Sequence, residues 1–143
     1  MSEKMEAKIR YLEMIQNVIQ RMASNSFQLK GWTVTLISII YAIIHNSADV
    51  KTFALLFLLL LAFWSLDAYY LQLERSYRLL YKVVVKGNKE VDFAMDPYME
   101  QVECGGDNKI NYWNCFWSIT EKGFYLPVGI IVAIIIIAKV CFK

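Results

Sequence analysis

The stretch that decides the fold is residues 52–86, TFALLFLLLLAFWSLDAYYLQLERSYRLLYKVVVK. It begins as an apolar run and passes through Asp67 into a basic, tyrosine-rich segment without meeting a Gly or a Pro. As one helix of about 35 residues it would be roughly 50 Å long. The hydrocarbon core of a bilayer is only about 30 Å thick. The sequence therefore predicts a membrane span over residues 52–70 that continues into water as a helical extension over residues 71–87.

The composition points to a small all-α membrane protein. Of 143 residues, 57% are hydrophobic and 20% are charged, and the apolar residues occur in blocks, which is typical of membrane spans. The polar N-terminus, MSEKMEAKIR, does not resemble a cleavable signal peptide, so the first span is expected to act as an uncleaved anchor. A net charge of +2 gives no reason to expect a nucleic-acid partner. We expect one membrane domain, residues 1–143, with three transmembrane helices and an N-terminal amphipathic helix.

The amphipathic helix is predicted over residues 3–26. Its apolar side chains recur every three or four residues, at Met5, Ile9, Leu12, Ile15, Ile19 and Met22, and Tyr11 and Val18 widen this stripe. This helix either lies in the plane of the membrane or packs on the water-exposed part of residues 52–86, or on a second copy. Packing is favoured because the polar face carries both signs of charge and is not rich in Lys and Arg.

The first span is predicted over residues 27–45. Its small side chains fall on one face, at Gly31, Thr35, Ser38 and Ala42. In lipid such a face allows another helix to approach closely. Two partners remain open for this helix-packing face: the second span, or a second copy of the chain.

A short turn, HNSADVK (residues 45–51), should make the first two spans an antiparallel hairpin. Lys30 lies 18 residues before Ala48 and Asp67 lies 19 residues after it, so the two charges should reach the same depth. A charge within a span is costly unless it is paired or reaches the interface. We predict an intramembrane ion pair between Lys30 and Asp67, with a contact between Asp67 and Gln28, or simple exposure at the interface, as alternatives.

Beyond Asp67 the predicted helix carries a basic face, formed by Arg75, Arg78, Lys82 and Lys86. This face either binds anionic headgroups or a phosphate-bearing ligand, or is solvated and only sets orientation. An acidic loop is predicted over residues 88–109, where its carboxylates would neutralise basic residues on the extension.

The remaining chain is predicted as an interfacial aromatic helix over residues 110–122 and a third span over residues 123–142. As an alternative, the aromatic segment packs against the hairpin from the cytosolic side. The cysteines, Cys104, Cys115 and Cys141, form no CxxC pair and share no loop with His45, so no metal is expected. No pair of reactive side chains converges in sequence, so we expect neither an enzyme nor a cofactor.

The Lys and Arg residues predict the orientation. Residues 1–30 contain five and residues 70–123 contain seven, whereas the other loop and the C-terminus contain three. By the positive-inside rule the N-terminus and residues 70–123 are cytosolic and the C-terminus is outside. Cys104 and Cys115 would then be reduced.

Two stretches, RMASNSFQLKGWTVTLIS (21–38) and LDAYYLQLERSYRLLYKVV (66–84), look like a family of small prokaryotic membrane proteins. The arrangement of an N-terminal helix, a hairpin and a long cytosolic extension resembles the SLATT-type membrane effectors of bacterial conflict systems. The resemblance covers about residues 5–86. It implies an oligomeric effector in the inner membrane that is triggered by a cytosolic sensor or signalling protein in anti-phage defence and perturbs or permeabilises the bilayer. It carries over no functional residue.

Two alternatives stand beside this prediction of an effector. The protein could be a structural membrane anchor or adaptor for a soluble partner, held by its acidic and aromatic cytosolic parts. A holin has a similar number of spans, but the predicted cytosolic excursion is long for a lysis pore. The effector prediction has one difficulty, since the spans have few polar side chains to line a pore.

Overall fold

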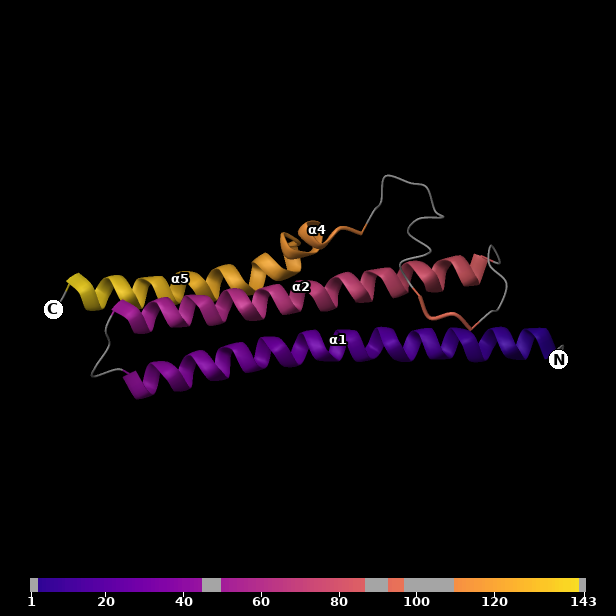
Figure 1. Cartoon of the computed structure of the whole chain (residues 1–143), viewed down its shortest axis with the longest axis horizontal. Coiled ribbons are helices and arrows are strands. Elements are labelled where there is room, and N and C mark those ends of the chain that lie inside the picture. The colour runs from indigo at the N-terminus through magenta and orange to yellow at the C-terminus, as the bar shows by residue number, and fades with distance from the viewer. Residues whose placement is uncertain (1–2, 45–49, 87–92, 97–109, 142–143) are drawn as a thin grey trace.

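The computed structural model describes residues 3–44, 50–86, 93–96 and 110–141, and all regular secondary structure in them is helical. The helices are α1 (Glu3–Ile44), α2 (Val50–Lys86), α4 (Tyr112–Phe116) and α5 (Ile119–Cys141). α1 and α2 lie side by side and antiparallel over most of their length, and α5 lies along the first half of α2 (Figure 1). The molecule therefore has a three-helix half, where α5 is present, and a two-helix half, formed by residues 3–26 and 68–86.

α2 is the long helix that the sequence predicts. It runs for 37 residues without interruption and does not bend away near Tyr70. At about 1.5 Å per residue it is roughly 55 Å long. The absence of Gly and Pro leaves every backbone N–H after the first turn able to bond within the helix. The helix thus joins the two halves of the molecule as one element.

α1 is also a single helix, of 42 residues, where the sequence predicts an amphipathic helix (3–26) followed by a separate span (27–45). No proline separates the two stretches, so the helical hydrogen bonds can continue from one to the other. Gly31 lies in open space, with no neighbour within 4 Å of the position of a Cβ. α2 presents an uninterrupted surface, and α1 packs along this surface. The two expected elements are therefore one continuous helix.

The two-helix half has its own small core. Tyr11 and Ile15 of α1 are fully buried against Leu80 and Val84 of α2. This is the packed arrangement of the N-terminal helix that the sequence favours. The buried residues Tyr11 and Ile15 belong to the predicted stripe, whereas Met5 and Ile9 at its N-terminal end are 58% and 40% exposed. Tyr11 is suited to this contact because its ring fills the space between the helices and its hydroxyl reaches a polar partner.

That partner is the segment 93–96, which crosses the two-helix half. The Tyr11 hydroxyl donates to the Ala94 carbonyl at 2.5 Å, and the Tyr77 hydroxyl donates to the Met95 carbonyl at 3.0 Å. The Phe93 ring lies edge-on to Tyr11, with 5.5 Å between ring centroids. These contacts hold a short part of the predicted 88–109 loop against both helices. The rest of that loop lies outside the described residues.

The three-helix half is apolar inside and outside. Leu60, Trp64 and Tyr125 form one cluster, and Leu56 and Val132 form another. α5 approaches α2 closely at Gly129, where an added Cβ would lie 3.3 Å from Leu60 Cδ2. The outer surface is apolar on all three helices. The large hydrophobic side chains that are at least 50% exposed there are Phe27, Trp32, Ile39, Ile43, Leu55, Leu58, Leu66, Ile119, Ile130, Ile131, Ile134 and Ile137.

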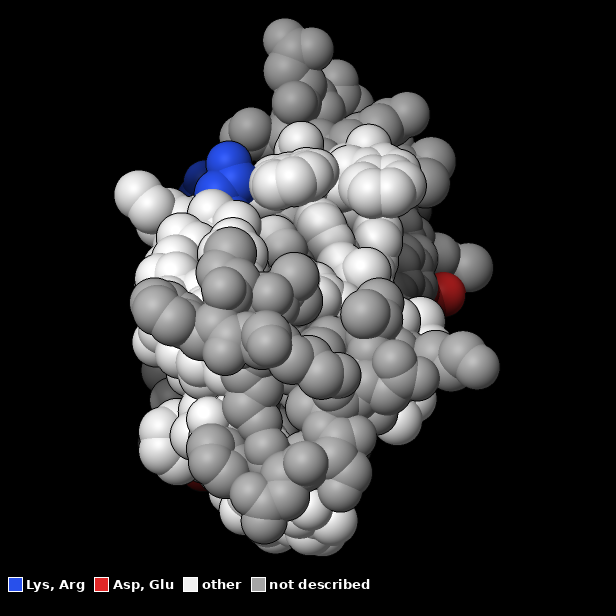
Figure 2. Space-filling view, turned by 90° about the vertical axis from the view of Figure 1, so that its left-hand side faces the viewer, with Lys and Arg blue, Asp and Glu red and all other residues white. Residues whose placement is uncertain are grey.

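Figure 2 looks onto the end of the molecule where α1 ends and α2 begins. In the part of this view that belongs to described residues, most side chains are uncharged, and Lys, Arg, Asp and Glu show only toward the margins. The sequences of the three helices agree with this view, because each contains a long stretch without charge. Residues 31–43, 54–66 and 123–138 contain no Asp, Glu, Lys or Arg.

Two of the three predicted spans meet the length and composition of a membrane-crossing helix. Among the described residues these are Ala54–Lys86 in α2 and Ile119–Ala138 in α5. The first predicted span, in α1, does not meet the same criterion within the described residues. The structure therefore supports an all-helical protein with two candidate spans among the described residues.

The predicted aromatic helix over residues 110–122 is divided in two. α4 has five residues and ends where the Trp117 N–H and the Ser118 N–H donate to the Trp113 and Cys115 carbonyls, both at 3.0 Å. A new helix begins immediately, since the Lys122 N–H donates to the Ser118 carbonyl at 3.0 Å. Residues 119–122 therefore belong to α5, four residues before the predicted start of the third span.

Candidate functional site

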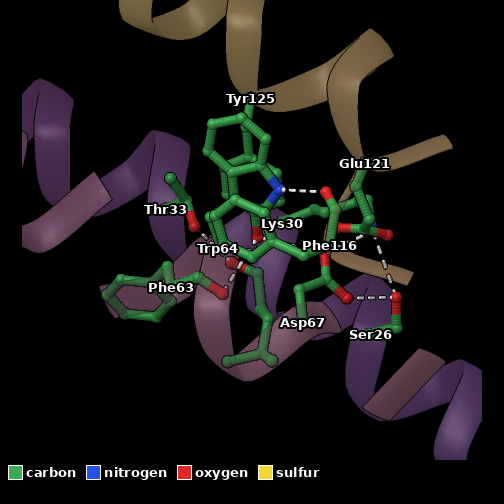
Figure 3. A network of polar contacts seen from close by, with 10 residues as sticks. Ser26, Lys30, Thr33, Phe63, Trp64, Asp67, Phe116, Glu121 and Tyr125 are labelled. Carbon is green, nitrogen blue, oxygen red and sulfur yellow. Dashed lines mark hydrogen bonds and ion pairs between the residues drawn. The ribbon is translucent and has the colours of Figure 1, made fainter. Parts of the chain in front are cut away.

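A buried network of charged and hydroxyl side chains lies at the junction of the two halves, where α5 begins (Figure 3). Lys30 of α1, Asp67 of α2 and Glu121 of α5 meet there. The side chains of Asp67 and Glu121 are 0% and 1% exposed, while that of Lys30 is 18% exposed. The site thus brings three helices together through ionisable groups that are almost completely removed from solvent.

Asp67 accepts hydrogen bonds on both carboxylate oxygens. Its Oδ1 receives the Ser26 hydroxyl, and its Oδ2 receives the Lys30 ammonium. The Tyr125 hydroxyl lies 3.0 Å from the same Oδ2 and 3.4 Å from the Phe63 carbonyl. A carboxylate with these donors, one of them a cation, is well compensated for its burial.

Lys30 uses all three of its ammonium N–H groups. They are directed to Asp67 Oδ2, to Ser26 Oγ at 3.1 Å and to Glu121 Oε1 at 3.2 Å. The ammonium also lies 6.0 Å from the centroids of the Phe124 and Tyr125 rings, within the range of a cation–π contact. A lysine has no further donor to offer.

Glu121 is less well satisfied than Asp67. Its Oε1 receives Lys30, but its Oε2 is buried and has no hydrogen-bond partner among the described residues. The Ser118 hydroxyl, immediately before α5, is the other buried side-chain polar atom of the described chain without a partner. Unsatisfied buried polar atoms are uncommon in native proteins and often mark a functional position.

Aromatic side chains cover the site on the side of α4 and α5. The Trp64 ring stacks on Phe116 and on Tyr125, with centroid distances of 4.5 and 5.6 Å. Its Nε1 donates to the Phe116 carbonyl at 3.0 Å. The Tyr112 hydroxyl donates to the Ser65 carbonyl at 3.1 Å. These contacts hold α4 and the start of α5 on α2 and exclude water from the carboxylates.

The structure places Lys30 against Asp67, as the counting of residues from the turn suggests. The alternative partner of Asp67, Gln28, instead donates to Ser24 Oγ at 3.4 Å. The sequence analysis missed Ser26, Glu121 and Tyr125. For Glu121 a signal was available, because S-I-T-E (118–121) before an apolar run has the form of a helix-capping box. That pattern marks the start of α5, although here the glutamate faces Lys30.

The predicted helix-packing face is exposed. Gly31, Thr35, Ser38 and Ala42 all lie on the outside of α1, so this face does not pack on the second span. The Thr35 and Ser38 hydroxyls donate to the Gly31 and Val34 carbonyls of their own helix, at 2.9 and 2.8 Å. The face is therefore small and internally satisfied, and α1 turns larger side chains such as Ile37 toward α2.

The predicted basic face is only partly free. Arg78 pairs with Glu74 at 2.7 Å, and Arg75 Nη1 donates to Cys115 Sγ at 3.7 Å. Lys82 and Lys86 are exposed. Since Arg75 is directed toward α4, the four side chains do not form one continuous cationic surface.

Cys115 is a free, buried thiol in the described structure. Burial raises the pKa of the Cys115 thiol, and the neighbouring Arg75 acts in the opposite direction. In a C104S/C141S background we expect Cys115 to be alkylated slowly at neutral pH, because only the thiolate reacts. Replacing Arg75 by leucine should slow maleimide labelling severalfold further, whereas R78L should not change it. Equal rates in the two variants would show that Arg75 does not act on the thiol.

The site is a buried cluster of one lysine and two carboxyl side chains. The described residues contain no group of three or more His, Cys, Asp and Glu side chains placed to hold a metal. The cluster can fix three helices relative to one another, and it can exchange a proton. No family model matches the sequence, and neither the curated proteins nor the solved structures gave a match.

Proposed function

We propose that the chain is an integral protein of a bacterial inner membrane, with the three-helix half in the bilayer and the two-helix half in the cytoplasm. The apolar outer surface of the three-helix half supports this, because such a surface is unfavourable in water. In this arrangement α1 supplies a third span. The N-terminus is cytosolic and the C-terminus outside, in agreement with the distribution of Lys and Arg.

Within that membrane the protein acts as an oligomeric effector that perturbs or permeabilises the bilayer when it is triggered. The observation that carries this proposal is the exposed face of Gly31, Thr35, Ser38 and Ala42. Nothing in the described monomer covers it, and small residues at helical spacing are what close helix contacts in lipid require. A groove of about 210 Å³ between α1 and α5, lined in part by Val34 and Ser38, lies next to this face and would receive side chains of a second copy.

The trigger would act on the two-helix half. α1 and α2 run from there into the apolar half without a break, so a partner that rotates or separates the helices at one end changes their packing at the other. A cytosolic sensor or signalling protein is the expected partner.

Gly31→Leu tests the proposal. The added side chain would clash across a close helix contact at a cost of about 1–3 kcal/mol per interface, which weakens association by roughly five- to 160-fold. Upon expression with its neighbouring genes, the wild-type protein should depolarise the membrane and crosslink as an oligomer, and G31L should do neither efficiently.

Gly123→Leu is the matched control, because Gly123 of α5 also has no neighbour within 4 Å but lies off the face. We expect G123L to behave as wild type. If G31L and G123L depolarise cells equally, the small-residue face is not the surface of assembly.

A second candidate is an anchor or adaptor for a soluble protein. A cleft of about 640 Å³ on the two-helix half favours it, lined by Met14, Met22, Met95 and Arg21 among others. Flexible methionines suit adaptable protein contacts. An adaptor would leave the membrane potential intact while co-purifying with a soluble protein, and Met14→Glu would abolish that association.

A further inference from the structure

The cluster of Lys30, Asp67 and Glu121 contains one more negative than positive group if all three are ionised. The cluster is almost fully buried, at the edge of the apolar half. An uncompensated charge in such a place is strongly unfavourable, and proteins avoid it by binding a proton or an ion. The count alone shows that one positive charge is missing, but it does not show which carboxyl is affected.

The hydrogen bonds distinguish the two carboxyls. Asp67 receives Ser26, Lys30 and Tyr125, so both of its oxygens have donors. Glu121 receives only Lys30, on Oε1, and its Oε2 has no donor at all. Lys30 has no further N–H to give. Asp67 is therefore the better satisfied carboxyl, and Glu121 Oε2 is the carboxyl oxygen without a donor.

We propose that the Lys30–Asp67–Glu121 cluster is a proton-binding site, and that the exchangeable proton resides on Glu121 Oε2. The ligand is the proton itself, delivered from water along the partly exposed Lys30 side. With the proton bound, the cluster is neutral: one ammonium, one carboxylate and one carboxylic acid. The bound proton would turn Glu121 Oε2 from a buried acceptor without a donor into a donor itself.

The groups that face Glu121 come from every element packed around it. They are Lys30 from α1, Asp67 from α2, Cys115 from α4 with Arg75 behind it, and Tyr125 from α5 itself. Lys30 alone among these is a cation in contact with the carboxyl, and it is shared with Asp67. Arg75 is directed to Cys115 and so does not supply the missing charge.

Loss of the proton would leave Glu121 charged in a place that already holds Asp67. The S-x-x-E pattern gives the carboxylate an alternative, since a glutamate at this position can reach the free backbone N–H groups at its own helix N-terminus. Proton release would then loosen α5 from α1 and α2. This inference does not depend on the proposed effector function.

Infrared spectroscopy of the purified protein in lipid tests the site directly. At neutral pH the wild-type spectrum should contain the carbonyl band of a protonated carboxyl that shifts on labelling with ¹³C-glutamate. The band should be absent in Glu121→Gln and retained in Glu74→Gln, which removes a carboxyl outside the cluster. If the wild-type protein has no such band, or if E121Q retains it, the proposal is wrong.

A second measurement uses stability. In the unfolded chain a glutamate ionises near pH 4.3, so a folded protein that keeps Glu121 protonated binds one more proton than the unfolded one above that pH. Its folding equilibrium constant should then fall by up to about tenfold per pH unit. E121Q lacks this dependence, and E74Q keeps it. Parallel pH curves for wild type and E121Q would overturn the assignment; if E121Q does not fold, E121D must shift the infrared band.

Discussion

Replacing Lys30 by methionine should destabilise the folded protein by about 3–5 kcal/mol, the usual cost of removing one partner from a buried ion pair. Methionine preserves the length of the side chain but leaves the Asp67 carboxylate, which is fully buried, without its cation. Ser26 and Tyr125 remain as donors, yet they carry no charge. The measurement is reversible unfolding in mixed micelles, followed by circular dichroism.

The matched control removes the whole cluster. The triple variant K30M/D67L/E121L has no charge left to compensate and should recover most of the stability lost in K30M, because apolar replacement of a complete buried charge cluster is often neutral or stabilising. Lower pH should also lessen the deficit of K30M, since a proton on the carboxyl can substitute for the missing ammonium. A triple variant as unstable as K30M would mean that Lys30 acts through packing of its methylenes.

Leu80→Ala should destabilise the two-helix half by about 2–5 kcal/mol, the range for a fully buried leucine. Leu80 is 0% exposed and lies against Tyr11 and Ile15, so its removal leaves a cavity at the centre of a small core. Since that half contains few other buried side chains, we expect local opening while the three-helix half persists. Limited proteolysis should then cut residues 3–26 or 68–86 in L80A and spare α5.

Val85→Ala is the control for this variant. Val85 lies on the same helix but is 49% exposed, so the substitution should change stability by no more than about 0.5 kcal/mol. If L80A and V85A were cut at the same rate, the contact between α1 and α2 in the two-helix half would not contribute to stability. In that case the continuous helices could not transmit a cytosolic event.

The Lys30–Asp67–Glu121 cluster shows which contacts can be predicted by counting residues along the sequence. Lys30 and Asp67 are equidistant from a short turn, and a helical hairpin brings such residues to one level whatever the details of packing. Glu121 belongs to a helix separated from the hairpin by residues 87–118, so no count relates its depth to that of Lys30. Its position depends on how α5 docks, through Trp64, Tyr125 and Gly129.

The helix-packing face shows the opposite case. Residue spacing places four small residues on one face of a helix: Gly31, Thr35, Ser38 and Ala42. It does not show whether that face is turned toward α2 or toward the outside of the molecule. The rotation of α1 about its axis is determined by its larger side chains, from Tyr11 to Ile37, which pack along α2. The small residues are therefore left on the outside.

The sequence by itself determined that the chain is helical, that residues 52–86 form one long helix, and where the charge-free stretches lie. These properties are local: they follow from periodicity, from the absence of Gly and Pro, and from the length of each apolar run. Only the tertiary structure decided that α1 is a single helix, that its small face is exposed and that Glu121 joins Lys30 and Asp67. Those properties depend on contacts between residues far apart in the chain, and such contacts are selected by the combined packing of three helices rather than by any one segment.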